Sequence, residues 1–286
     1  MDRRCFVASC GCAMLGAPLL TRQLAAQTPG TRVFQWERGL AVEMTATPGM
    51  AVFLWFYEWN MFNAVRAAEH TEGRFEDFQR TVDPNGTAAS TANNEFRLTV
   101  NATDDGADLS LEVTNNSDHD WPALAAIIPC LSPGIVSEHL NERRGVAEGQ
   151  LPPRNPAFAN ENTFFLGANG LELLHGREIR FNNKLRADLD ATSPEGRFVF
   201  SNKWPTARPD ATGGLIMRQS TDGAWVTGIA WQDFLSVQAH NPWRCMHLAV
   251  RVGPLKQNEA KTLRGKLYLI KGSKDDCLGR YRTDFA

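Results

Sequence analysis

The chain of 286 residues lacks the short motifs that mark several large enzyme classes. It has no Gly-x-Gly-x-x-Gly fingerprint and no Walker loop, which argues against a nucleotide cofactor held by a glycine-rich turn. It also has no Gly-x-Ser-x-Gly elbow, on which α/β-hydrolases present their nucleophile. Beyond residue 26 there is no Cys-x-x-Cys pair, so thioredoxin-like and c-type haem chemistry are not expected.

Charge and hydropathy are not strongly biased either. The 30 Lys and Arg residues nearly balance the 32 Asp and Glu residues, and the net charge is −2. No basic stripe indicates nucleic-acid binding. No apolar run reaches the roughly 20 residues that a membrane-spanning helix needs. We therefore expect neither a nucleic-acid partner nor a stable membrane span.

The N-terminus carries the most specific signal in the chain. Arg3, Arg4 and Phe6 in "MDRRCFVASCGCAMLGAPLL" resemble the Arg-Arg-x-Phe core of a twin-arginine export signal, and small residues follow near Ala26. The alternatives are a Sec signal that carries two arginines, and a lipoprotein box at "VASC". We expect an export signal over residues 1–26, a single β-rich domain over 27–286, and a periplasmic or secreted protein.

Loss of such a signal removes three of the six cysteines. Cys130, Cys245 and Cys277 remain, and export places them in an oxidising compartment. One disulfide and one thiol is the simplest expectation, and the sequence does not show which two cysteines pair.

The rest of the chain consists of short alternating segments separated by Gly, Pro, Asn and Asp. Examples are "DLSLEV", "RFVFSN", "GLIMRQS", "AWVTGIAWQ", "CMHLAVRVG" and "TLRGKLYLIKG". The apolar run "LAAIIPC" is typical of a strand buried on both faces. This pattern predicts an all-β, mainly antiparallel fold, a β-sandwich or supersandwich with at most one or two short helices. One such helix is expected within residues 60–69.

The stretch "SVQAHNPWRCMHLAVRV", residues 236–252, is the densest collection of chemically useful side chains. Alternation puts Met246, Leu248, Val250 and Val252 on a core face, and Cys245, His247, Ala249 and Arg251 on the other. The second face is predicted either to line a ligand groove or to be a solvated face with a disulfide at Cys245. His240, Trp243 and Arg244 lie in the turn that leads in, where loops often carry function.

A metal site is a second interpretation of the same residues. His240 and His247, with a carboxylate or a third histidine, supply ligands that zinc accepts, so a divalent metal is a candidate cofactor. Asp118, His119 and Asp120 in "NSDHDW" could add ligands, although this pattern is more typical of a polar turn. The spacing of a calcium-binding loop is absent.

Tryptophans beside polar residues favour a glycan or another small polar ligand, because a flat ring buries apolar area while its neighbours bind hydroxyls. Trp55, Trp59, Trp204 and Trp243 have such neighbours, whereas Trp225 and Trp231 fit a strand core. Candidate acid–base residues are His240, His247 and His70. Candidate ligand-binding residues are Arg244, Arg251, Trp243, Trp59 and Glu58.

Three hypotheses follow. The first is an exported carbohydrate-active enzyme (a lyase, epimerase or hydrolase) that uses His and Arg residues on a sheet face. The second is a non-catalytic module that binds glycans or the cell envelope, and the third is a metal-dependent exported protein. The histidine-bearing strand resembles, at the level of fold alone, mutarotase-like supersandwiches, which implies a broad groove and assigns no residue.

Overall fold

The computed structural model describes residues 29–36, 39–60, 79–92, 96–133, 155–192, 205–240 and 244–286, with the backbone alone for 56–60 and 192. The export signal, His70, Trp204, Trp243, the strand expected at "RFVFSN" and most of the helix expected within 60–69 lie outside these ranges.

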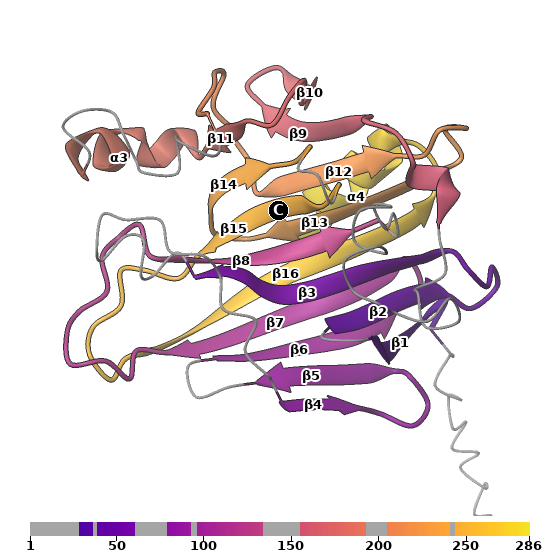
Figure 1. Cartoon of the computed structure of the whole chain (residues 1–286), viewed down its shortest axis with the longest axis horizontal. Coiled ribbons are helices and arrows are strands. Elements are labelled where there is room, and N and C mark those ends of the chain that lie inside the picture. The colour runs from indigo at the N-terminus through magenta and orange to yellow at the C-terminus, as the bar shows by residue number, and fades with distance from the viewer. Residues whose placement is uncertain are drawn as a thin grey trace, which may run out of the picture.

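One layer of the fold is a seven-stranded sheet that is assembled from distant parts of the chain (Figure 1). Its neighbouring strands are antiparallel throughout. In spatial order they are β1 (Thr31–Trp36), β2 (Gly39–Met44), β3 (Ala51–Asn60), β8 (Ala126–Ser132), β15 (Met246–Arg251), β14 (Phe234–Gln238) and β11 (Ile179–Phe181).

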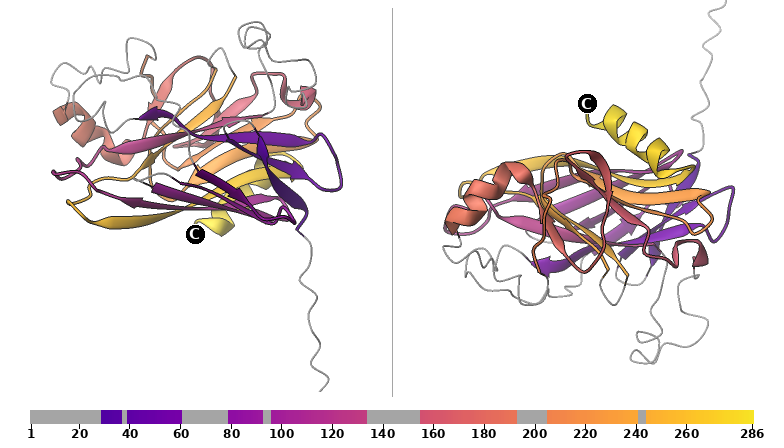
Figure 2. Two further views of the ribbon diagram at one scale, coloured as in Figure 1. Left: turned by 60° about the horizontal axis from the view of Figure 1, so that its bottom comes forward. Right: turned by 90° about the horizontal axis from the view of Figure 1, so that it is seen from above.

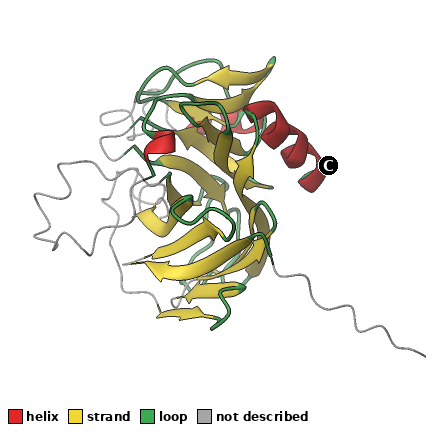
Figure 3. Ribbon diagram, turned by 90° about the vertical axis from the view of Figure 1, so that its right-hand side faces the viewer, coloured by secondary structure: helices red, strands yellow, loops and turns green. Residues whose placement is uncertain are grey.

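The second layer is a nine-stranded sheet, also antiparallel between all neighbours. Its order is β10 (Gly170–Leu173), β9 (Thr163–Gly167), β12 (Leu215–Gln219), β13 (Trp225–Trp231), β16 (Ala260–Lys271), β7 (Gly106–Thr114), β6 (Phe96–Thr103), β5 (Ala88–Ala92) and β4 (Gln79–Val82). Figure 3 shows the sheets from the side. The prediction of an all-β antiparallel sandwich is confirmed.

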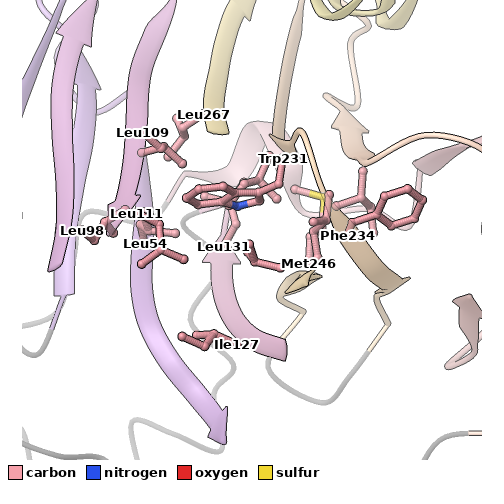
Figure 4. Close-up of a cluster of buried hydrophobic side chains, with 14 of the residues drawn as sticks. Leu54, Leu98, Leu109, Leu111, Ile127, Leu131, Trp231, Phe234, Met246 and Leu267 are labelled. Carbon is pink, nitrogen blue, oxygen red and sulfur yellow. The ribbon is translucent and has the colours of Figure 1, made fainter. Parts of the chain in front are cut away.

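The main core fills the space between the two sheets, and Trp231 lies at its centre (Figure 4). Trp231 is 1% exposed and packs with leucines from both layers, including Leu54 and Leu267. Its cross-strand partner is Gly265, and a Cβ there would meet the indole ring at 2.6 Å. The large ring therefore fits because the facing position has no side chain.

Each outer face of the sandwich carries a smaller apolar cluster covered partly by a helix. α4 (Lys274–Asp284) lies outside the sheets (Figure 2, right) and packs Cys277 and Leu278 against the nine-stranded sheet. η2 (Asn183–Leu185) and α3 (Arg186–Thr192) pack Leu185 and Leu189 against the seven-stranded sheet. A further single 3-10 turn, η1, spans Pro156–Phe158. Within the described ranges, no helix is long and apolar enough to cross a membrane.

Candidate functional site

Strand β15 is buried on both of its faces. Met246, Leu248 and Val250 point into the main core, as the alternation predicts. On the opposite face, Ala249 joins the cluster under α3, and His247 is only 1% exposed. The side of the strand that carries His247 is therefore not solvated, and the alternative of a water-facing strand is wrong for this residue.

Strand register places a row of side chains across the outer face of the seven-stranded sheet. Trp55 of β3 lies opposite Cys130 of β8, and Cys130 lies opposite His247 of β15. His247 in turn lies opposite Gln238 of β14. Residues from four strands, up to 192 positions apart in the sequence numbering (55 to 247), thus meet side by side. Since directly opposed side chains contact each other in a sheet, the row is a single physical unit.

Cys245, which directly precedes β15, lies close to Cys130 and His247 of this row. The potential ligand atoms of Cys130, Cys245 and His247 all lie within 4.8 Å of one another, and all three residues are buried. His247 Nδ1 lies 3.1 Å from the side-chain nitrogen of Gln238. We refer to Cys130, Cys245 and His247 as the thiol–histidine cluster.

The disulfide expected among the three cysteines is not formed in this structure. Cys277 lies apart from the other two, in α4 against the nine-stranded sheet. Burial, reinforced by nearby carboxylates such as Asp105, raises the pKa of the Cys277 thiol. An oxidising compartment alone would therefore not determine whether these cysteines pair. A disulfide also requires suitable distances and orientations of the two cysteines, which the fold sets.

His240 lies at the end of β14 with its ring engaged by the backbone. Its Nε2 donates to the carbonyl oxygen of Leu174 at 2.7 Å, and its backbone φ is +61°. Burial lowers the pKa of His240; the hydrogen bond to Leu174 raises it, and the charge of Arg218 lowers it further. The imidazole is thus held largely neutral near pH 7.

Arg244 is fixed by a buried arginine from the other sheet. Its φ is +56°, and its carbonyl oxygen accepts a hydrogen bond of 3.1 Å from Nη1 of Arg218. Arg218 is 1% exposed and also donates from Nε to the hydroxyl of Thr163 at 2.9 Å. Burial lowers the pKa of Arg218 to about 10, so the guanidinium remains charged at neutral pH.

Arg251, a candidate ligand-binding residue, is held by a carboxylate. Its Nε and Nη2 donate to the two oxygens of Asp233 at 2.8 and 3.1 Å. Lys261 shares the same carboxylate at 3.3 Å. The guanidinium is thus part of a three-residue ion-pair network with Asp233 and Lys261.

The remaining candidates are placed as follows. Glu58 and Trp59 lie in β3, and only their backbone is described, whereas His70 and Trp243 lie outside the described ranges. The segment "NSDHDW", residues 116–121, forms a polar turn. The side chain of the preceding residue, Asn115, accepts from the backbone N–H of Ser117 and donates to the carbonyl oxygen of His119. The prediction that His70, His240 and His247 act together as acid and base stays a prediction, because His70 lies outside the described residues.

Four aromatic side chains gather beside the thiol–histidine cluster, on the outer face of β1 to β3. The Trp36 ring lies 4.8 Å from Trp55, edge to face, and 4.4 Å from Phe53. Phe34 completes this aromatic cluster. Between β1 and β3, strand β2 contributes only Gly39 and Ala41 to these rows.

Phe53 is buried, whereas the other three rings remain partly exposed. The indole N–H of Trp36 is covered and has no hydrogen-bond partner among the described residues. Small residues on β2 thus let rings from its two neighbours meet above it, and the resulting surface presents partly exposed ring faces.

Sequence reasoning selected Trp55 but missed Phe34, Trp36 and Cys130. The alternation in "TRVFQW" places Arg32, Phe34 and Trp36 on one face, and this signal was available. Cys130 had no comparable local signal, because its neighbours form a run that is buried throughout.

Comparisons with known proteins assign no family to this chain. No family model matches the chain, and no curated protein matches it. Among solved structures, a galactose mutarotase-like protein from Lactobacillus casei ATCC 334 is 12% identical, with a TM-score of 0.40 over 84% of this chain and 100% of the other. A galactose mutarotase related enzyme from Lactobacillus acidophilus is 10% identical, with a TM-score of 0.39 over 87% and 97%.

A protein assigned as an aldose 1-epimerase from Escherichia coli K12 is 9% identical, with a TM-score of 0.36 over 71% of each chain. At such identities and scores these likenesses assign no residue and no reaction to the present chain.

Proposed function

We propose that this protein binds carbohydrate outside the cytoplasm, and that the aromatic cluster of Phe34, Trp36, Phe53 and Trp55 receives the sugar. The observation that supports the proposal is the partly exposed group of rings on the outer face of β1 to β3. Sugar rings have apolar C–H faces, and aromatic side chains bury such faces with a large gain in contact area.

Polar groups at the border of the cluster suit the hydroxyls of a sugar. The Arg32 guanidinium lies 5.5 Å from the centre of the Phe34 ring and pairs with Glu43 at 2.5 Å. The Arg32 side chain is 56% exposed, so its remaining N–H groups are available to an acceptor.

Binding without turnover is the form of the hypothesis that the described residues support. His247 is 1% exposed and His240 donates to the Leu174 carbonyl, so neither is presented to a ligand at the aromatic cluster. A general acid or base must lie within hydrogen-bond reach of the reacting group. The enzyme hypothesis therefore draws no support from these two residues, whereas the aromatic cluster supports recognition.

A glycan array tests the proposal. We expect the wild-type chain beginning at residue 27 to bind a subset of glycans, and a Trp36→Ala/Trp55→Ala variant to lose that binding. The matched control is Phe285→Ala, because Phe285 is a partly buried ring in another aromatic pair, 5.2 Å from Tyr281 on the opposite side of the sandwich. Circular dichroism of each variant establishes that it is folded.

Incubation of the bound glycan with the protein then separates binding from catalysis. Recovery of unchanged glycan, with the same linkage and anomeric composition as a protein-free sample, is expected. Appearance of a cleaved or epimerised product would favour the enzyme hypothesis, and absence of any glycan binding would contradict the proposal.

Export is a separate part of the proposal, and its support is the Arg-Arg-x-Phe segment at residues 3–6. We expect the wild-type chain to reach the periplasm or medium of a host that has the twin-arginine system. An Arg3→Lys/Arg4→Lys variant should accumulate in the cytoplasm, because the paired arginines are the recognised element. Equal export of both chains in a host that lacks the twin-arginine system would instead identify a Sec signal.

A further inference from the structure

We propose that Cys130, Cys245 and His247 bind one thiophilic metal ion, zinc(II) or copper(I), in a buried site within the outer face of the seven-stranded sheet. The proposal is independent of carbohydrate binding. It differs from the metal site expected from the sequence, which combined His240 and His247 with carboxylates. The fold instead brings His247 to two cysteines, one of them from β8.

The distances within the cluster suit a shared ion. The three potential ligand atoms lie within 4.8 Å of one another. Zinc–sulfur bonds of about 2.3 Å at tetrahedral angles place two sulfur atoms about 3.8 Å apart, so side-chain adjustments of about 1 Å complete the geometry. Two thiolates and one imidazole form a soft ligand set, which favours zinc(II) or copper(I) over magnesium or calcium.

A disulfide fits the same two cysteines less well. Cys130 lies opposite His247, and Leu131 lies opposite Met246, so continuation of this register places Cys245 opposite Ser132. Cys130 and Cys245 are then diagonal neighbours, whose Cβ atoms in a regular sheet are roughly 7 Å apart, against about 3.8 Å in a disulfide. An ion that holds its sulfur ligands well apart bridges a diagonal pair more readily than a direct S–S bond does.

Burial shields the site from bulk solvent. Cys130, Cys245 and His247 are 1%, 2% and 1% exposed. Three protein ligands leave the fourth position of a tetrahedral zinc(II) ion to water, whereas copper(I) accepts three-coordinate geometry. An ion at this place would link β8 to the start of β15 in the middle of the sheet.

Two neighbouring residues would orient the ligands. The side-chain amide of Gln238 lies 3.1 Å from Nδ1 of His247, and its nitrogen and oxygen ends are interchangeable by assignment. With the amide oxygen accepting from Nδ1–H, Nε2 is left to coordinate the ion, as is usual for metal-bound histidines. Arg218 holds the carbonyl of Arg244, the residue just before Cys245, and so fixes the backbone of that ligand.

Metal analysis of purified protein tests the site. The chain beginning at residue 27 is purified without chelators, reduced, and loaded anaerobically with zinc(II) alone or copper(I) alone. After desalting, we expect about one equivalent of ion per chain in the wild type, and loss of that equivalent in Cys130→Ser and in Cys245→Ser. The matched control is Cys277→Ser, which changes a third buried cysteine outside the cluster and should retain the ion.

A second measurement keeps the test decisive if a serine variant folds poorly. In the loaded wild type, Cys130 and Cys245 should resist alkylation under mild unfolding conditions, and removal of the ion by a chelator should abolish that protection. Retention of either ion with this pattern supports the site, and the ion that survives competition by a chelator identifies the occupant.

Three results would overturn the proposal. The first is folded wild-type protein that retains neither ion, and the second is equal retention by all four proteins. The third is a Cys130–Cys245 disulfide, found by peptide mapping of protein isolated from the periplasm, that persists in the presence of both ions.

Discussion

At the scale of single residues, Trp231 and Gly265 show how one position limits another across a strand pair. The added Cβ of a Gly265→Ala variant would lie 2.6 to 2.8 Å from three atoms of the Trp231 ring. Because the ring is 1% exposed, it has little room to move. We expect the variant to lose about 1–3 kcal/mol in the free energy of unfolding, as overpacked cores do.

Denaturant titration measures this loss, and Gly279→Ala is the matched control. Gly279 lies in α4 with no atom within 4 Å of a Cβ built on it. Alanine is the better helix former, so the control should be unchanged or more stable by up to about 1 kcal/mol. Equal effects of the two substitutions would contradict the packing argument.

His240 gives the fold a predictable response to pH. Its pKa in the folded state is lowered below the ordinary value of 6.5, chiefly by burial, with Arg218, Glu161 and Glu178 as the surrounding charges. The unfolded chain then binds the proton more readily than the folded chain. The stability contributed by neutral His240 is therefore present above pH 6.5 and is lost as the pH falls toward the folded-state pKa.

The variant that reveals this contribution is His240→Asn, since asparagine also tolerates the observed φ of +61°. Between pH 8 and pH 5, the free energy of unfolding of the wild type should fall more steeply than that of the variant. Parallel curves over this range would show that the folded-state pKa of His240 is not lowered.

Residue-level prediction from the sequence was successful where it relied on alternation alone. Met246, Leu248, Val250 and Val252 occupy the main core as expected, and Trp231 is a core residue. It failed where the outcome depended on which element covers a sheet face, as for His247. The sequence pattern of a polar residue is the same whether that residue faces water or is buried under a neighbouring element.

At the scale of elements, the sequence analysis predicted no helix at α4, although the sequence contains a capping signal at the start of this helix. Ser273 and Asp276 form a capping box: the Asp276 backbone N–H donates to the Ser273 hydroxyl, and the Ser273 N–H donates to the Asp276 carboxylate at 2.7 Å. The Ser273 backbone N–H and the Ser273 hydroxyl, which lies 2.8 Å from the same carboxylate oxygen, lower the pKa of Asp276 by hydrogen bonding to its carboxylate. The helix has weak amphipathic periodicity, which explains why a search for apolar stripes does not find it.

Removal of the cap should loosen α4 without changing the sheets. We expect Ser273→Ala to reduce the free energy of unfolding by about 1 kcal/mol, and Ser273→Thr to restore most of it. Hydrogen exchange localises the effect: amides of α4 should exchange faster in the alanine variant, while those of β13 and β16 are unchanged. A uniform change across the chain would contradict the assignment of Ser273 as a local cap.

The strands were easier to predict than the helices, since period-two alternation and turn residues bound each of them. The run "LAAIIPC" is buried throughout, as predicted, but the strand itself is Ala126–Ser132, so Leu124 and Ala125 precede it. The pairing of strands was not predictable in the same way. β8 comes to lie between β3 and β15 because of contacts far apart in the sequence, and no local pattern specifies that order.

At the scale of the whole molecule, the fold class could be read from the sequence and the candidate site could not. The two clusters on the seven-stranded sheet exist only because β1, β2, β3, β8, β14 and β15 are placed side by side. The Trp36 ring contacts Trp55 above Gly39 of β2, and Cys130 of β8 lies directly opposite His247 of β15. Such meetings depend on register between distant segments, which composition and spacing do not contain.

The affinity of the protein for its preferred glycan tests the central claim most directly. Isothermal titration calorimetry of the wild type, Trp55→Ala and Phe285→Ala gives three dissociation constants at one pH and one salt concentration. If the aromatic cluster receives the sugar, Trp55→Ala should weaken binding by about tenfold or more, as loss of a central aromatic contact does, and Phe285→Ala should leave it unchanged. A folded Trp55→Ala protein with wild-type affinity would contradict the account.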